Sequence, residues 1–74
     1  MGTYEINVTL IEELQTLKDT DELDRIFARA KSTIVNGESV VLLRKPAGGK
    51  AEKFDELTTL EDLAQYRNRV FRYL

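Results

Sequence analysis

The sequence contains no cysteine and no histidine, and this absence removes several kinds of chemistry. Without these residues the chain forms no disulfide and offers a metal no thiolate or imidazole ligand. It also lacks the usual acid–base group near neutral pH and the most reactive nucleophile. A mechanism based on carboxylates or lysine would need a cleft that a small core can hardly form. We therefore expect no enzyme activity, catalytic residue, metal site, cofactor or small-molecule substrate.

Long apolar runs are also absent. No uncharged run approaches the roughly 20 residues of a membrane span, and the first residues lack a signal-peptide pattern, so we expect no membrane association. With no cysteine to report a redox compartment, a cytoplasmic location is the default expectation. The 74 residues predict one compact domain, residues 1–74. A chain of this length buries only about 60–65% of its unfolded surface, so it depends on close packing or on a partner.

The charged residues are unevenly distributed along the chain. The net charge of the whole sequence is −2, with residues 1–24 at −6, residues 25–53 at +5 and residues 54–74 at −1. Such segregation is typical of solvated helix faces, but an acidic front and a basic middle can also pair within the fold or between molecules. A homodimer is therefore one of the expectations.

The first half of the chain predicts one strand and two helices. Residues 3–8 alternate between apolar and polar side chains, as in a short strand with one buried face. Thr9 and Glu12 have the spacing of a capping box, which predicts a helix that ends near Lys18. Asp19 is the expected cap of the next helix, which Asn36-Gly37 ends. The apolar stripe of that helix comprises Leu23, Ile26, Phe27, Ala30 and Ile34.

The second half predicts a β-hairpin and a final helix. ESVVLLRK (residues 38–45) is apolar on both faces, so we expect a central strand covered on each side. After the loop PAGG, residues 50–54 (KAEKF) are typical of an edge strand protected by lysines. Thr58 and Glu61 have the spacing of a further capping box. The predicted fold is α+β, three helices on a small antiparallel β-hairpin sheet in the order β-α-α-β-β-α, and strand 3–8 joins either this sheet or that of a second molecule.

The last ten residues, QYRNRVFRYL, interleave arginines with aromatic rings. On a helical wheel the rings and the arginines do not share a face, as a base-stacking platform would require. Phe71 falls in the apolar stripe, Tyr66 and Tyr73 flank it, and Arg69 and Arg72 point roughly opposite. We therefore interpret this segment as an amphipathic helix with cations near its C-terminus.

Arg67 departs from that pattern because it projects from the middle of the apolar stripe, between Leu63 and Leu74. Either its stem covers apolar surface while its head reaches water or an acid of the same chain, or the stripe faces a partner whose carboxylate Arg67 meets.

Four cations surround the tip of the hairpin, and no aromatic residue lies among them. A basic, projecting hairpin can contact phosphates in a nucleic-acid groove. More commonly, such side chains keep an exposed tip soluble and an edge strand unpaired. PAGG lacks the spacing of a phosphate-binding loop, so we interpret it as a turn. The four cations are Arg44, Lys45, Lys50 and Lys53.

Residues 20–74 resemble the small phage head-to-tail joining proteins of the W family. The matching stretches are ARAKSTIVNGESVVLLRK and KFDELTTLEDLAQY, a helix followed by a basic hairpin and a capped second helix. The resemblance implies a non-enzymatic structural adaptor that docks among virion proteins, with the hairpin cations as its contacts.

These observations predict a non-enzymatic interaction or structural module that acts through contact with a protein partner or with itself. The alternative is a small nucleic-acid-binding regulator that uses the basic hairpin tip. The candidate partner-binding residues are Arg44, Lys45, Lys50, Lys53 and Arg67.

Overall fold

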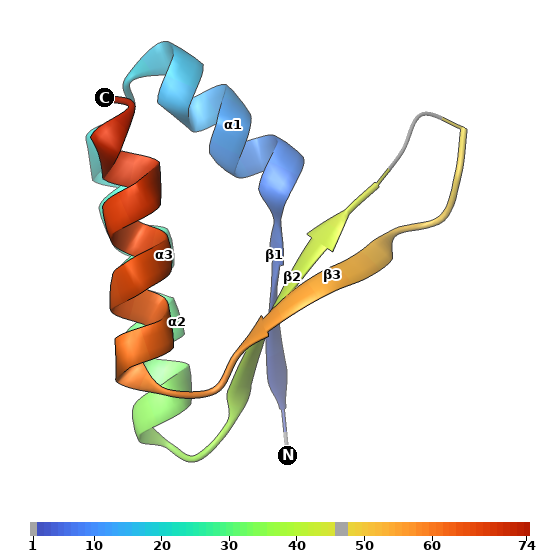
Figure 1. Cartoon of the computed structure of the whole chain (residues 1–74), viewed down its shortest axis with the longest axis vertical. Coiled ribbons are helices and arrows are strands. Elements are labelled where there is room, and N and C mark those ends of the chain that lie inside the picture. The colour runs from blue at the N-terminus through green and yellow to red at the C-terminus, as the bar shows by residue number, and fades with distance from the viewer. Residues whose placement is uncertain (1, 46–47) are drawn as a thin grey trace.

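A computed structural model describes residues 2–45 and 48–74 of the chain. The helices and strands follow the predicted order, and the predicted α+β class is confirmed (Figure 1). They are β1 (Thr3–Asn7), α1 (Val8–Leu17), α2 (Thr20–Val35), β2 (Ser39–Arg44), β3 (Glu52–Leu57) and α3 (Leu60–Arg72).

The three strands form one sheet in the order β1-β2-β3. β2 and β3 form the expected antiparallel hairpin, but β1 lies parallel to β2, with Tyr4 opposite Val40 and Ile6 opposite Leu42. The prediction of a purely antiparallel sheet is therefore wrong for the first strand. The physical reason is the connection: α1 and α2 return the chain to the start of the sheet, and such a helical crossover joins parallel neighbours. The first strand thus joins the sheet of its own chain.

The two capping boxes predicted at Thr9 and Thr58 are each misplaced. α1 is capped by Asn7, whose side chain accepts a hydrogen bond from the Thr9 backbone N–H at 2.9 Å. Asn7 is the stronger cap, and it shortens β1 because Val8 is already helical. α3 is capped by Thr59, whose Oγ1 accepts from the Asp62 backbone N–H at 3.0 Å.

Asp62 completes this cap from within the first turn of α3. Its carboxylate accepts hydrogen bonds from the backbone N–H and the hydroxyl of Thr58. The backbone hydrogen bond from Thr58 is the main reason that the pKa of Asp62 lies below its usual value. The cap residues are thus Thr59 and Asp62, one position after the predicted pair.

α2 begins and ends where the sequence predicts. Asp19 Oδ1 accepts from the Glu22 backbone N–H at 3.2 Å. At the other end Gly37 has φ of +84°, and the backbone N–H groups of Gly37 and Glu38 donate to the carbonyls of Ile34 and Thr33. This is a Schellman motif, and it turns the chain directly into β2.

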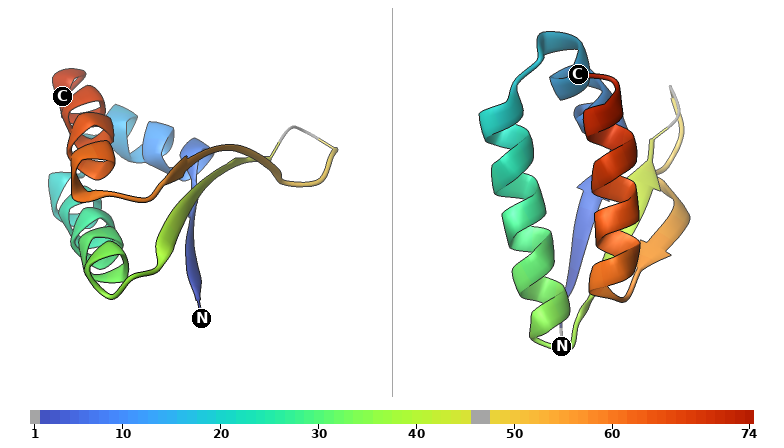
Figure 2. Two further views of the ribbon diagram at one scale, coloured as in Figure 1. Left: turned by 60° about the horizontal axis from the view of Figure 1, so that its bottom comes forward. Right: turned by 60° about the vertical axis from the view of Figure 1, so that its left-hand side comes forward.

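All three helices cover the same face of the sheet (Figure 2). The prediction that β2 is covered on both sides is therefore wrong. Val40 and Leu42 point toward the helices and are fully buried, whereas Val41 and Leu43 point to the open face and are half-buried. Phe54 lies at a β-bulge in the edge strand β3 and is 53% exposed. The core comprises Ile6, Val8, Ile11, Leu14, Leu23, Ile26, Phe27, Ala30, Val40, Leu42, Leu57, Leu63, Tyr66 and Val70.

Candidate functional site

The final helix buries one stripe and exposes its arginines, as the wheel predicts. Arg69 and Arg72 are exposed in the last turn, where the carbonyl ends of a helix favour cations. Tyr66, predicted at the edge of the stripe, instead lies in the core with its ring 5.8 Å from that of Phe27 in an edge-to-face contact. Phe71 is half-buried against the same ring, at 6.0 Å.

Arg67 joins α3 to α2. Its Nη2 donates to Oδ1 of Asp24 at 3.4 Å, and its guanidinium lies 4.4 Å from the centre of the Phe71 ring. The geometry therefore matches the first interpretation of Arg67, a stem over apolar surface and a head paired with an acid of the same chain. The Arg67 side chain remains about half exposed, so the pair lies at the surface. A role in partner binding stays a prediction.

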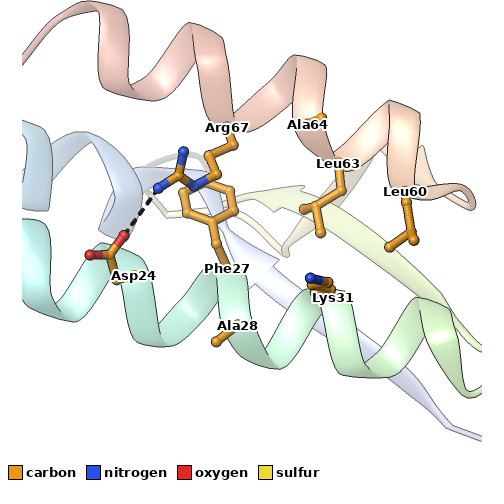
Figure 3. Close-up of a pocket in the computed structure, with 8 residues that line it drawn as sticks. All are labelled: Asp24, Phe27, Ala28, Lys31, Leu60, Leu63, Ala64 and Arg67. Atoms are coloured by element: carbon orange, nitrogen blue, oxygen red, sulfur yellow. Dashed lines mark hydrogen bonds and ion pairs between the residues drawn. The ribbon is translucent and has the colours of Figure 1, made fainter.

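This ion pair closes one end of a groove between α2 and α3 (Figure 3). The groove has a volume of about 480 Å³, and apolar side chains form most of its lining. Lys31 and Leu60 lie at its other end, and Leu60 is 46% exposed. The lining residues are Asp24, Phe27, Ala28, Lys31, Leu60, Leu63, Ala64 and Arg67.

Of these groove residues, the sequence predicted only Arg67 as a candidate for partner binding, whereas Phe27 and Leu63 were predicted as parts of apolar stripes. The helical wheel places Ala64 with Leu60 and Leu63 in the apolar stripe of the last helix, and it places Lys31 outside the stripe of α2. Asp24 is predicted as a favourable acid in the first turns of α2. The structure instead leaves Leu60 and Ala64 exposed, so this part of the predicted stripe lines the groove and not the core.

Among the residues that the structure describes, two of the four hairpin cations form ion pairs with carboxylates. Arg44 makes a two-pronged contact with Glu12 of α1, with both nitrogen–oxygen distances at 3.3 Å. Lys53 pairs with Glu56 at 2.6 Å, and this hydrogen bond is the main cause of the lowered pKa of Glu56. Lys45 and Lys50 are exposed near the loop, of which residues 46 and 47 lie outside the described part of the chain. Two of the four cations thus already face a carboxylate.

The hydroxyl of Tyr66 is buried, and none of the described residues offers it a hydrogen-bond partner. Burial raises the pKa of Tyr66 to about 12, and the nearby positive charge of Arg69 opposes this rise only in part. The cause is desolvation, which disfavours the tyrosinate relative to the neutral phenol.

We predict that the wild type loses stability at alkaline pH and that Tyr66→Phe does not show this loss. Because the pKa is raised in the folded state from an ordinary value near 10, neutral Tyr66 contributes stability that is complete below about pH 10 and is lost as the pH rises toward 12. Urea unfolding followed by circular dichroism at pH 7 and pH 11 measures this loss. Tyr66→Phe should be at least as stable as the wild type at pH 7, since the hydroxyl it removes is unpartnered. Tyr73→Phe, which alters an exposed ring, should keep the wild-type pH dependence.

The described residues hold no cluster of three or more acidic side chains suited to a metal ion. Among the helices of residues 2–45 and 48–74, none has the length and apolar character needed to cross a membrane. Comparison with known proteins adds no relative: no family model matches the chain, and neither curated proteins nor solved structures give a match.

Proposed function

We propose that this chain is a non-enzymatic interaction module that acts through protein–protein contact, with the α2–α3 groove as its contact surface. The observation that carries the proposal is an apolar groove, open to solvent, with charged side chains at both ends. Protein interfaces combine these features, an apolar centre and a polar rim. Ala28, Lys31 and Ala64 line the groove and are exposed, so a partner reaches it without any rearrangement of the fold.

Two residues of the groove favour contact with a protein. Leu60 is 46% exposed at one end, and covering an apolar side chain contributes about 25 cal/mol for each Å² removed from water. At the other end Arg67 is held over Phe71 and beside Asp24. A guanidinium held in place loses little side-chain entropy on binding, and arginine is enriched at interfaces.

The alternative, nucleic-acid binding by the hairpin, receives less support from the geometry. Glu12 and Glu56 face Arg44 and Lys53, so contact of these two cations with phosphate would compete with existing ion pairs. Lys45 and Lys50 remain exposed, which keeps the alternative testable. The adaptor role implied by the W-family resemblance and the cytoplasmic location stay predictions.

Photo-crosslinking in the cells that produce the protein tests the proposal. The photoreactive residue p-benzoylphenylalanine replaces Ala64 in the groove or, as the matched control, Ala51 beside the hairpin loop; both alanines are exposed. We expect ultraviolet light to yield a protein adduct, visible as a discrete heavier band, from position 64 and a much weaker one from position 51.

The outcomes separate the two functions. A protein adduct at position 64, with the same chain or a different one, supports the proposed function. No protein adduct at position 64, or an adduct at position 51 that nuclease removes, overturns it; the second result would favour the nucleic-acid alternative.

A further inference from the structure

We propose that the α2–α3 groove receives an amphipathic helix of another protein, one whose apolar stripe is flanked by acidic residues. This inference rests on the proposed function and states the chemistry of the partner. The shape, the backbone and the charge of the groove walls each favour such a helix.

The two walls of the groove have the same spacing of residues. Each helix contributes a row at positions i, i+3, i+4 and i+7, and residues so spaced form the hole that receives a side chain of a facing helix. The rows are Asp24, Phe27, Ala28 and Lys31 on α2, and Leu60, Leu63, Ala64 and Arg67 on α3. Phe27 and Leu63 are buried, whereas the short side chains of Ala28 and Ala64 are exposed and leave room above them. The walls therefore suit an apolar stripe with helical spacing.

The two rows are offset along the helix axes (Figure 3). Ala28 lies opposite Arg67, and Ala64 lies opposite Lys31, so at both levels a short side chain faces a long cation. Asp24 lies beyond the first level and Leu60 beyond the second. The groove thus extends for about three helical turns, and an apolar side chain that enters over either alanine has a cation beside it.

The backbone of the walls favours a helix over an extended segment. Residues 24–31 and 63–67 lie within α2 and α3, where the backbone N–H and C=O groups bond to one another inside each helix. An extended chain in the groove would find no backbone partner along these residues, and its own polar groups would lose water at a cost. A helix satisfies its own backbone groups and buries only its apolar stripe.

Charge favours acidic residues on both sides of that stripe. Within residues 2–45 and 48–74, Lys31 has no ion pair. Arg67 uses Nη2 for its contact with Asp24, and a guanidinium carries five N–H donors, so others remain for a second carboxylate. Because Lys31 and Arg67 lie on opposite walls, a carboxylate on either flank of the incoming stripe can pair with one of them.

A second copy of this chain does not present such a helix in the part that the structure describes. α1 exposes Leu10 and Leu17, but Leu14, which lies between them on the same face, is 6% exposed in the core of its own chain. The apolar stripes of α2 and α3 are buried in the same core. We therefore assign the incoming helix to another protein.

Fluorescence anisotropy of labelled peptides, titrated with the purified full chain, tests this inference. The acidic probe is a designed peptide of about 18 residues, long enough to form a helix in water, with a leucine stripe and glutamates on both flanks. A second peptide has lysine in place of each glutamate, and a third keeps the glutamates but carries prolines that break the helix. We expect saturable binding of the acidic helix, roughly tenfold weaker binding of the lysine peptide and no binding of the proline peptide.

A charge reversal in the groove provides a second measurement. Lys31→Glu replaces an attraction with a repulsion, so it should weaken binding of the acidic peptide roughly fivefold to tenfold and strengthen binding of the lysine peptide. The matched reversal Lys50→Glu on the hairpin changes the net charge equally and should alter neither affinity. Both lysines are exposed, and circular dichroism shows whether each variant is folded. The comparison of the three peptides on the wild type stands even if a variant does not fold.

No saturable binding of the acidic peptide, equal binding of the lysine or proline peptide, or an affinity that folded Lys31→Glu leaves unchanged would overturn the inference. If position 64 still gives a protein crosslink, such a result overturns only the chemistry assigned to the partner. If position 64 gives no protein crosslink, the proposed function is overturned as well. A crosslinked species that consists of two copies of this chain would overturn the assignment to another protein while supporting the proposed function.

Discussion

Phe27→Ala is expected to lower the free energy of unfolding by about 3–5 kcal/mol. Phe27 is 4% exposed, and its ring packs against Tyr66 and Phe71, so it forms the joint between α2 and α3. Truncating a buried phenylalanine costs about 3–5 kcal/mol through lost burial and the cavity left behind. A chain of this length has a total stability of only about 4–11 kcal/mol. The substitution therefore removes a large part of the free energy of unfolding.

Phe54→Ala provides the matched control. It removes the same atoms from a ring that is 53% exposed at the bulge of β3, so its effect should stay below about 1 kcal/mol. Urea unfolding of the wild type and both variants, followed by far-ultraviolet circular dichroism, gives the three free energies. Similar costs for Phe27→Ala and Phe54→Ala would contradict the assignment of Phe27 to the centre of the core.

The elements that the sequence predicted well are those governed by local interactions. The stripe of α2, its cap at Asp19 and its end at Gly37 each depend on residues within a few positions of one another. A cap side chain reaches only two or three residues along the chain, and a helical stripe repeats every three or four. Both signals are therefore present in the order of the residues alone.

The features that the sequence did not predict depend on contacts between distant parts of the chain. Alternation in residues 3–8 indicates a strand but carries no information on its direction relative to β2, which the α1–α2 crossover decides. The capping errors at Thr9 and Thr58 have another cause: several cap-forming residues lie together in each segment, and spacing alone did not select among them.

The candidate site shows the same division. Arg67 was identified because a cation within an apolar stripe is a local anomaly. Its partner Asp24 lies 43 residues away and became visible only when α2 and α3 were placed side by side. The groove itself is a product of that placement, since a place for Ala64 in the apolar stripe does not show that it stays exposed beside α2. What could be predicted was a single unusual residue; the surface around it required the fold.

Leu42→Ala and Leu43→Ala should differ strongly, because these neighbours on β2 point to opposite faces of the sheet. Leu42 is fully buried beneath the helices, and its truncation should cost about 2–5 kcal/mol. Leu43 lies half-buried on the face that carries no helix, so the same change should cost less than about 1.5 kcal/mol. Urea unfolding of both variants measures the two free energies.

Comparing the costs of Leu42→Ala and Leu43→Ala tests whether one face of the sheet is covered or both. The sequence of β2 is equally apolar on both sides and predicted equal burial, whereas the structure buries only the side of Val40 and Leu42. Equal costs at the two positions would therefore contradict the one-sided packing. Repeating the experiment at a tenfold higher protein concentration separates folding from association, because the stability of an associated chain depends on its concentration. A cost for Leu43→Ala that grows with concentration would mean that a second molecule covers the open face of the sheet. A small cost of Leu43→Ala at both concentrations would show that neither a helix nor a second molecule covers Val41 and Leu43 on the open face of the sheet.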